Sequence, residues 1–252
     1  MTEQEQYMQD FLYIFSALEC WGPGSEEETK KAYYLMGFSP QNILELGCGK
    51  GNSTMVLAKV SKANIVAIDS EQSALDKLNQ KIQASHLSSR VSVKCMDMAE
   101  FSVDKNGFSK NSVDLIWAEA SLYVVGVCKA LINWRPLLQE NGLLVFSDLV
   151  WLSEAPSAEA KDFWLMDYPD MKDVNQRLSE IKKAGYHVEE TFTMSEEAWK
   201  NYYEPLQQRI DSLTGTIANS QAARDITREI NVYKKYLGEF AYQFFIVRKA
   251  SA

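Results

Sequence analysis

The stretch Ile43-Leu-Glu-Leu-Gly-Cys-Gly-Lys-Gly51 decides the fold. A short apolar run contains the carboxylate Glu45 and leads into three glycines at alternate positions. The following residues, Asn52–Lys59, begin with polar side chains and continue with apolar ones at helical spacing. This order predicts a strand, a tight glycine turn and a helix. Glycines let the backbone come close to a ligand, and the start of a helix offers free N–H groups.

A second strand, Asn64-Ile-Val-Ala-Ile-Asp69, follows and also ends in an acid. An acid at the tip of the second strand, about 20 residues after the glycine turn, typically binds a pair of ribose hydroxyls. We therefore expect Asp69 and the adjacent Ser70 to contact a nucleotide. The alternative is a glycine-rich turn that binds nothing, and the position of Asp69 argues against it.

Two further strands end in acidic residues. Val91–Cys95 alternates apolar and polar residues and is followed by Asp97 and Met98. Val113–Trp117 is mostly apolar and is followed by Glu119. Each acid has a purely structural interpretation: Asp97 as a surface turn residue, and Glu119 as an acceptor for local backbone N–H groups.

Strands and helices alternate along the chain, which indicates a mostly parallel sheet with helices on both faces. Ligands then bind at the carboxyl ends of the strands, where the strand order reverses. Beyond the segments above, the pattern predicts strands at Gly142–Phe146, His187–Thr193 and Tyr242–Arg248, and helices at Thr54–Val60, Gln72–Ser85, Val124–Leu138 and Asp173–Ala184.

The length of 252 residues suits one domain. Three segments lie outside the alternation: residues 1–36 form an N-terminal helical cap, and residues 151–169 and 195–237 are insertions. Insertions of this kind often form lids or substrate walls. The aromatic stripe in the last segment is more typical of core packing than of ligand contact. We expect a packed lid whose outer turn lies at the pocket.

Composition excludes several classes of function. The net charge of −8 disfavours nucleic-acid and anionic-membrane partners, and no apolar run approaches the length of a membrane span. The polar, acidic start is unlike a secretory signal, and four scattered cysteines suggest free thiols in a cytoplasmic protein. The two histidines, His86 and His187, lack the spacing of a metal site or a catalytic triad, so no metal is expected.

The glycine spacing resembles motif I of the class I S-adenosylmethionine (SAM) dependent methyltransferases. Dinucleotide-binding turns read Gly-x-Gly-x-x-Gly, whereas this turn reads Gly-x-Gly-x-Gly after Glu45. The chain is also similar to a bacterial group of UbiE-like small-molecule methyltransferases. That likeness rests on Trp21-Gly-Pro-Gly-Ser25, Asp114-Leu-Ile-Trp-Ala-Glu-Ala-Ser-Leu-Tyr123, Asp162-Phe-Trp164 with Tyr168-Pro169, and Ala184-Gly-Tyr186. The group usually has Gly and Asn where Ala120 and Val124 stand here.

The resemblance implies a Rossmann-like, mostly parallel seven-stranded sheet whose last strand is antiparallel. It also implies roles for particular residues. Glu45 and Gly47 would face the methionine end of SAM, and Asp97 with the backbone of Met98 would bind adenine. The expected cofactor-binding residues are Trp21, Ser25, Glu45, Gly47, Gly49, Asp69, Ser70, Asp97, Met98 and Glu119. The expected catalytic residues are Glu119 and Tyr123, and Tyr123, Trp151, Trp164 and Tyr168 are expected to bind substrate.

The function that follows is transfer of a methyl group from SAM to a small-molecule acceptor by in-line displacement. The enzyme's main task would be to align two reactants, and Glu119, Asp148, Tyr123 and Tyr168 are candidates for a base. Each of the tryptophans could instead be core packing. Two other functions stay open: a non-catalytic SAM-binding regulator or partner subunit, and, less favoured, an NAD-dependent dehydrogenase. A homodimer is also compatible with the sequence.

Overall fold

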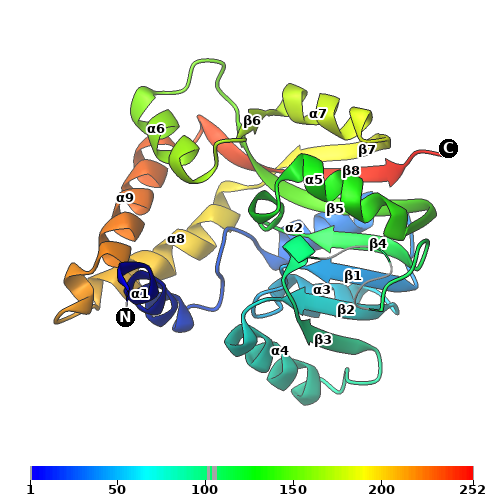
Figure 1. The fold of residues 1–252 in the computed structure, drawn as a ribbon, viewed down its shortest axis with the longest axis horizontal. Helices are drawn as coiled ribbons and strands as arrows, with labels where there is room; N and C mark the ends of the chain where they lie inside the picture. Colours follow the sequence, from blue (N-terminus) through cyan, green and yellow to red (C-terminus); the bar gives the residue numbers. More distant parts are fainter. Residues whose placement is uncertain (1, 101–102, 104–106, 252) are drawn as a thin grey trace.

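A computed structural model describes residues 2–100, 103 and 107–251 of the chain. One twisted sheet runs through the molecule in the order β3-β2-β1-β4-β5-β8-β7, and the short β6 pairs with the end of β5 (Figure 1). The strands are β1 (Asn42–Leu46), β2 (Asn64–Asp69), β3 (Val91–Cys95), β4 (Val113–Ala118), β5 (Leu138–Trp151), β6 (Lys172–Asp173), β7 (Tyr186–Thr193) and β8 (Phe240–Lys249).

The sheet is parallel except for its last strand. β8 lies antiparallel between β5 and β7, and every other neighbouring pair is parallel. The expected fold class is thereby confirmed, with the two-residue β6 as an eighth strand. The strand order reverses at β1 and β4, so the carboxyl ends of these strands mark the place where ligands bind in such sheets.

Helices cover both faces of the sheet. They are α1 (Glu3–Ser16), α2 (Glu26–Leu35), α3 (Asn52–Val60), α4 (Gln72–Ala84), α5 (Val127–Trp134), α6 (Ala158–Asp167), α7 (Val174–Lys183), α8 (Glu196–Asp211) and α9 (Gln221–Tyr236), with single 3-10 turns at Met98–Glu100, Leu122–Val124, Arg135–Leu137 and Ile217–Asn219.

Alternate residues of the central strands point into two separate cores. Ile43 of β1 packs with α3 and α4 on one face, whereas Leu44 and Leu46 pack with α5 on the other. Both sides of the strand are therefore buried, which is why β1 is an almost unbroken apolar run. The exception is Glu45, whose buried position is described below.

Two predicted elements have different bounds in the structure. The fifth strand is not limited to 142–146 but runs from Leu138 to Trp151, because its antiparallel partner β8 pairs with it along the whole second half. The helix predicted from Val124 begins only at Val127, after Gly126 with φ of 88°, and ends at Trp134, just before Pro136. Trp151 therefore belongs to the sheet and not to an insertion.

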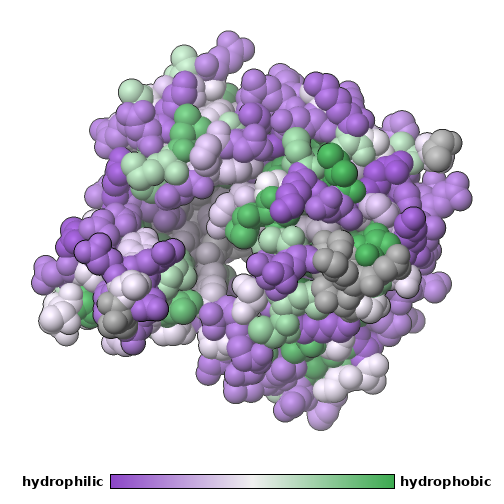
Figure 2. Space-filling view, viewed as in Figure 1, coloured by the Kyte–Doolittle hydropathy of each residue, from purple (hydrophilic) through white to green (hydrophobic). Residues whose placement is uncertain are grey.

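The helices outside the alternation gather at one side of the molecule. α1, α6, α8 and α9 pack against one another beyond the carboxyl ends of the central strands (Figure 1). Figure 2 shows that the surface is hollowed between this group of helices and the body of the sheet. The N-terminal segment is tied to α8, because the Gly24 N–H donates to the Ala198 carbonyl at 3.2 Å and the Ser195 N–H donates to Glu28 at 2.8 Å.

Candidate functional site

The glycine turn joins the ends of β1 and β2. The N–H groups of Gly47 and Cys48 both donate to the carbonyl of Ile68, at 2.8 and 3.0 Å. Gly47 has φ of 74°, and a Cβ there would lie 2.4 Å from the Cβ of Ser121, so only glycine fits. Gly49 also has positive φ, but no atom lies within 4 Å of where its Cβ would stand. The turn is therefore fixed to the end of β2 through Ile68, and the space next to Gly49 is open.

Glu45 is a buried carboxylate directly beneath this turn. The Ser53 hydroxyl, from the first turn of α3, donates to Glu45 Oε1. Glu45 Oε2 is also buried and has no hydrogen-bond partner among the described residues. Burial raises the pKa of Glu45 to about 7, and the neighbouring hydroxyls of Ser53 and Thr54 oppose this rise, although the Thr54 hydroxyl does not reach hydrogen-bonding geometry with Oε2. A buried carboxylate oxygen without a partner is costly, and a cationic ligand group would remove that cost.

Asp69 ends β2 beside the turn, and its two oxygens accept backbone hydrogen bonds. Oδ2 accepts from the Gly49 N–H at 2.8 Å, and Oδ1 accepts from the Glu71 N–H at 2.9 Å. Ser70 is exposed next to it. Each carboxylate oxygen has a second lone pair, so Asp69 can still accept from a ligand hydroxyl.

At the end of β3, Asp97 is exposed, and its Oδ1 accepts from the Ala99 N–H at 2.8 Å. Met98 is partly buried, and its methyl carbon would lie 3.4 Å from a Cβ on Gly47. The structure therefore brings Met98 close to the glycine turn. Asp97 lies after β3, the neighbour of β2, and its contact with the Ala99 N–H is the one expected of a surface turn residue.

Glu119 lies at the carboxyl end of β4, next to β1. Its Oε1 accepts from the Thr29 hydroxyl and from the Trp117 indole N–H, both at 2.8 Å. Oε2 accepts no hydrogen bond from the described residues, and it would lie 3.8 Å from a Cβ on Gly24. Burial raises the pKa of Glu119 to about 7, and the two donors oppose the rise.

The loop after Glu119 packs onto the glycine turn. Ala120 has φ of 49°, a left-handed conformation that is unfavourable for alanine. Its N–H donates to the Ser147 hydroxyl at 2.8 Å, and the Ser121 hydroxyl donates to the Leu46 carbonyl at 2.9 Å. Residues found in this region despite its cost often lie at functional sites. This is the position where the similar bacterial group usually has glycine.

The predicted N-terminal residues make contacts of their own. The Trp21 indole N–H donates to the Phe15 carbonyl at 3.0 Å, and the Lys50 ammonium lies 5.6 Å from the centre of the Trp21 ring. The Ser25 hydroxyl caps α2 by accepting from the Glu28 N–H at 3.1 Å. Both residues thus shape the segment that passes over Glu119, and both of these polar groups already have protein partners.

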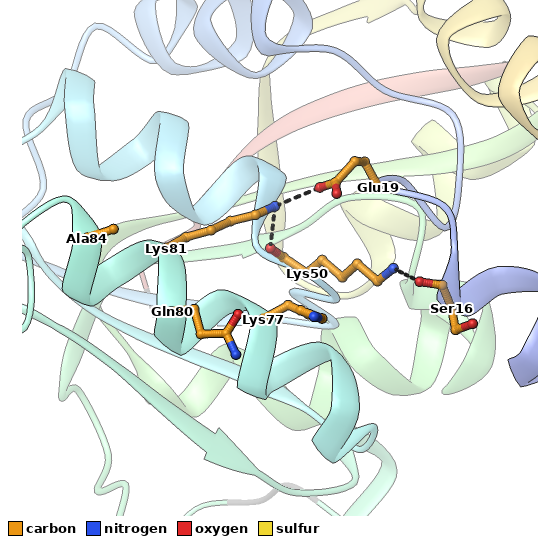
Figure 3. A pocket seen from close by; sticks show the side chains of 7 residues that line it. All are labelled: Ser16, Glu19, Lys50, Lys77, Gln80, Lys81 and Ala84. Carbon is orange, nitrogen blue, oxygen red and sulfur yellow. Dashed lines mark hydrogen bonds and ion pairs between the residues drawn. The ribbon is translucent and has the colours of Figure 1, made fainter.

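Lys50, inside the glycine turn, fixes the end of α1. Its ammonium donates to the carbonyls of Ser16 at 2.8 Å, Phe15 at 3.4 Å, and Leu18. α1 has no basic residue in its own last turn, so Lys50 supplies the cation that favours a helix C-terminus. Figure 3 shows this contact at the edge of a cavity of about 450 Å³, which α4 also lines. Burial lowers the pKa of Lys50.

The predicted substrate residues fall into two groups. Tyr123 and Tyr168 lie together, with ring centres 5.8 Å apart. The Tyr168 hydroxyl donates to Asp148 at 2.8 Å and accepts from Arg177 at 2.8 Å, and Arg177 also pairs with Asp148 at 2.8 Å. Asp148 and Arg177 are almost fully buried. This network holds Tyr168 rigidly and occupies its hydroxyl.

Trp151 and Trp164 form the second group, in which both rings make edge contacts with Phe240, at 6.5 and 5.1 Å between ring centres. Trp199 contacts the same phenylalanine at 5.7 Å. These contacts are those of core packing, the alternative stated for the tryptophans above. A ligand-binding role for Trp151 and Trp164 is not tested by them and stays a prediction.

Sequence reasoning missed several contributors. Thr29, Ser53 and Ser121 hold site residues, yet each occurs in an unremarkable polar stretch. Arg177 resembles the solvent-facing residue of an amphipathic helix, and only its buried partner Asp148, a polar residue inside an apolar strand, signals the pair. In the part of the chain that the structure describes, no group of three or more His, Cys, Asp or Glu side chains is suited to a metal ion.

The comparison with known families decides the class of this site. The profile of a family described as "Methyltransferase domain" matches residues 38–209. The chain belongs to this methyltransferase-domain family. The match spans the glycine turn, Asp69, Asp97 and Glu119. The expected class I SAM-dependent methyltransferase assignment is confirmed at the level of the class, whereas the UbiE-like subgroup stays a prediction.

Individual relatives of this methyltransferase-domain protein are distant. An uncharacterised protein of Haemophilus influenzae is 29% identical over 132 residues, which are 51% of this chain and 51% of that protein. Phosphoethanolamine N-methyltransferase 1 of Arabidopsis thaliana is 23% identical over 196 residues, which are 75% of this chain and 36% of the plant enzyme. The chain therefore spans about half or less of the length of these two relatives.

A solved structure supports the fold. A SAM-dependent methyltransferase from Geobacter sulfurreducens, in complex with S-adenosyl-L-homocysteine, superposes with a TM-score of 0.79 at 16% identity, over 95% of this chain and 97% of that one. At this identity the likeness shows the shared fold. Among the described residues, no helix is long and apolar enough to cross a membrane.

Proposed function

We propose that this protein binds SAM over the carboxyl ends of β1, β2 and β3 and transfers its methyl group to a small-molecule acceptor. The observation that supports this best is the unpartnered buried oxygen Glu45 Oε2 beneath the glycine turn. The methionine end of SAM has a cationic ammonium, which is the group that such a carboxylate lacks. The open space above Gly49 gives the ligand a close approach to the backbone.

The adenosine half would lie along the neighbouring strand ends. Asp69 would accept from the ribose hydroxyls with its free lone pairs, and Ser70 would lie at the rim. Asp97 would accept from the adenine amino group, and the Met98 N–H would donate to a ring nitrogen. The Gly49–Asp69 hydrogen bond of 2.8 Å supports this assignment, because it fixes the carboxylate next to the turn before any ligand is bound.

Bound SAM would supply an electrophilic methyl group on a sulfonium. The residues of the chain then have to hold the acceptor in line with that methyl group and exclude water, and alignment of this kind is worth on the order of 7–11 kcal/mol. Glu119 Oε2 and the Tyr123 hydroxyl would orient the acceptor or take its proton. A pKa of about 7 makes Glu119 a suitable base near neutral pH.

The remaining roles follow from the positions of the segments. Trp21 and Ser25 would close the N-terminal segment over SAM, and Tyr168 would form a wall of the acceptor pocket beside Tyr123. Residues 1–36, the insertion that follows Trp151 up to residue 169, and residues 195–237 would act as a cap and lids within one domain. Trp151 and Trp164 would border the pocket from the lid side. We also expect a cytoplasmic protein without a metal or a nucleic-acid partner, and a homodimer is compatible with this account.

The test is to incubate the purified protein with methyl-labelled SAM and fractionated metabolites and to identify the labelled product. Labelling of a small molecule that is lost in the Glu119→Gln variant supports the proposal. SAM binding without transfer to any fraction would instead favour a non-catalytic SAM-binding protein.

A further inference from the structure

Three tyrosines and one glutamate lie on elements that border the hollow between the lid helices and the sheet. Tyr202 lies on α8, Tyr242 on β8, Tyr123 on the loop after β4, and Glu229 on α9. These elements lie on both sides of the hollow that Figure 2 shows. Side-chain contacts join these residues into one cluster. The Tyr203 hydroxyl donates to Glu229 at 2.8 Å, and the Tyr202 and Tyr203 ring centres lie 4.7 Å apart. Trp199 lies 5.9 Å from Tyr203 and 5.4 Å from Tyr242 between ring centres. Burial raises the pKa of Tyr123, Tyr202 and Tyr242, and the charge of Glu229 adds to this rise.

Two of these tyrosines have hydroxyls without partners. Tyr202 is only 5% exposed and Tyr242 is only 9% exposed. Neither hydroxyl has a hydrogen-bond partner in the described part of the chain, and neither oxygen is completely sealed from solvent. Because both oxygens reach solvent and have no protein partner, a positively charged ligand can approach them directly.

The hollow is also negatively charged. Glu229 accepts a 2.8 Å hydrogen bond from the Tyr203 hydroxyl, but no described lysine or arginine forms an ion pair with it. The next charged group that acts on Glu229 is another acid, Asp167 at the end of α6. Arg177, a buried cation, is already paired with Asp148 and Glu180. Burial raises the pKa of Glu229 to about 7, so it ionises near neutral pH.

The chemistry of this space favours a cationic nitrogen. Aromatic faces, phenol oxygens and one carboxylate together attract an ammonium group, whereas a carboxylate or phosphate ligand would be repelled by Glu229. Tyr123 follows Glu119 by four residues in the segment after β4, and the charge of Glu229 contributes to its raised pKa after burial.

We infer that the methyl acceptor is a small amine, and that Tyr202, Tyr242 and Glu229 hold its nitrogen. This inference rests on the proposed function. Glu229 takes a proton from the ammonium form, and the freed nitrogen lone pair attacks the methyl carbon as the carbon–sulfur bond breaks. The electrons of that bond stay on sulfur as a neutral thioether. The nitrogen becomes a methylated ammonium, which the same residues bind as product.

A matched pair of probes tests the inference. Choline and 3,3-dimethylbutan-1-ol have the same shape, but only choline has a positive charge. We expect choline to bind the protein saturated with S-adenosylhomocysteine about tenfold or more tightly than the neutral alcohol, at pH 8, where Glu229 is ionised. Titration calorimetry measures both affinities. Equal binding of the two probes, or binding of neither, overturns the inference.

Variants locate the site. Glu229→Gln should reduce the preference for choline to within about threefold, whereas Glu204→Gln, on the exposed side of α8, should leave it unchanged. Because Glu229→Gln also alters the partner of Tyr203, Tyr202→Phe provides a second variant that removes only an unpaired hydroxyl. A preference for choline that survives in both variants places the nitrogen elsewhere and overturns the inference.

The same titrations separate this inference from the proposed function. Binding of S-adenosylhomocysteine is measured first in each protein. If the nucleoside binds and choline does not, the inference fails and SAM binding stands. If the nucleoside does not bind at all, the proposed function fails, and the inference fails with it.

Discussion

The Thr29 hydroxyl donates a 2.8 Å hydrogen bond to Glu119, although the two residues are 90 positions apart. Thr29 lies on α2, and Glu119 directly follows β4, so this contact connects the N-terminal cap with the proposed reaction centre. Trp117 donates to the same oxygen from within the sheet. The carboxylate is therefore oriented from two sides, and its second oxygen accepts no hydrogen bond from the described residues.

Glu119→Gln and Tyr123→Phe should reduce methyl transfer, because each removes an acceptor or proton-accepting group while preserving shape. SAM affinity should stay within about threefold of the wild type, since neither residue is the main cofactor anchor in this account. Thr29→Val is the matched variant that keeps the carboxylate but removes one donor, and its effect should be smaller. Steady-state rates with the acceptor found by labelling check this. Full turnover in both Glu119→Gln and Tyr123→Phe would show that these residues are structural.

Asp69→Ala should weaken S-adenosylhomocysteine binding roughly tenfold or more, since unpaired polar groups cost about 1–3 kcal/mol. Asp97→Ala is the comparison variant, and its effect should be smaller because the backbone N–H of Met98 remains. Calorimetry measures both affinities, and circular dichroism shows whether the fold is kept. An unchanged affinity in a folded Asp69→Ala protein would mean that Asp69 only anchors the turn through Gly49 and Glu71.

SAM affinity should rise with pH through neutrality. Burial raises the pKa of Glu45 to about 7, so below this pH the carboxyl holds a proton that a cationic ligand must displace. For one such group, affinity should increase roughly tenfold between pH 6 and pH 8, with proton release on binding at the acid end. Calorimetry in buffers of different ionisation enthalpy detects that proton.

The Glu45 carboxyl group should also make the free energy of unfolding depend on pH. Because the folded state keeps the Glu45 proton between pH 4.5 and about 7 while the unfolded chain loses it, the free energy of unfolding falls as pH rises through this window. Glu45→Gln should therefore lose less stability between pH 4.5 and pH 8 than the wild type does. Glu27→Gln, at an exposed position, is the control. Identical pH profiles for Glu45→Gln and the wild type would contradict the role of Glu45.

Lys50→Met should release the end of α1. The ammonium donates to three backbone carbonyls, and their loss should cost about 1–3 kcal/mol of stability and expose residues 1–20 to proteolysis. Lys77→Met is the control, because Lys77 lines the same cavity but is exposed. Urea unfolding and limited proteolysis measure the two effects. Equal protease resistance of the Lys50→Met and Lys77→Met proteins would show that other contacts hold α1.

Much of the sheet could be predicted from the sequence, for a physical reason. β1, β2, β3 and β4 are buried between helices or end in distinctive residues, so glycines and acids mark their carboxyl ends within a residue or two. The glycine turn and its acids then identified the family. β5 was predicted too short, because Ser147 and Asp148 interrupt its apolar pattern, and both polar side chains are buried with distant partners.

The contacts that complete the site could not be predicted. Lys50 looks like a variable residue of a glycine turn, but its ammonium is buried against α1. Arg177 and Tyr202 look like residues of ordinary amphipathic helices, and their partners or lack of partners appear only when the chain folds. Pairwise contacts between distant segments leave no local pattern in the sequence. The sequence therefore predicts the glycine turn and the acids at the strand ends, but not the residues that hold them in place.

The most direct test of the account is titration calorimetry of the wild-type protein with S-adenosylhomocysteine and with NAD, repeated with Glu45→Gln. We predict that the wild-type protein binds one S-adenosylhomocysteine per chain with saturation and does not bind NAD. The Glu45→Gln variant should bind S-adenosylhomocysteine at least about tenfold more weakly than the wild type, because the ligand's ammonium loses its carboxylate partner. Binding of NAD without S-adenosylhomocysteine would contradict the account.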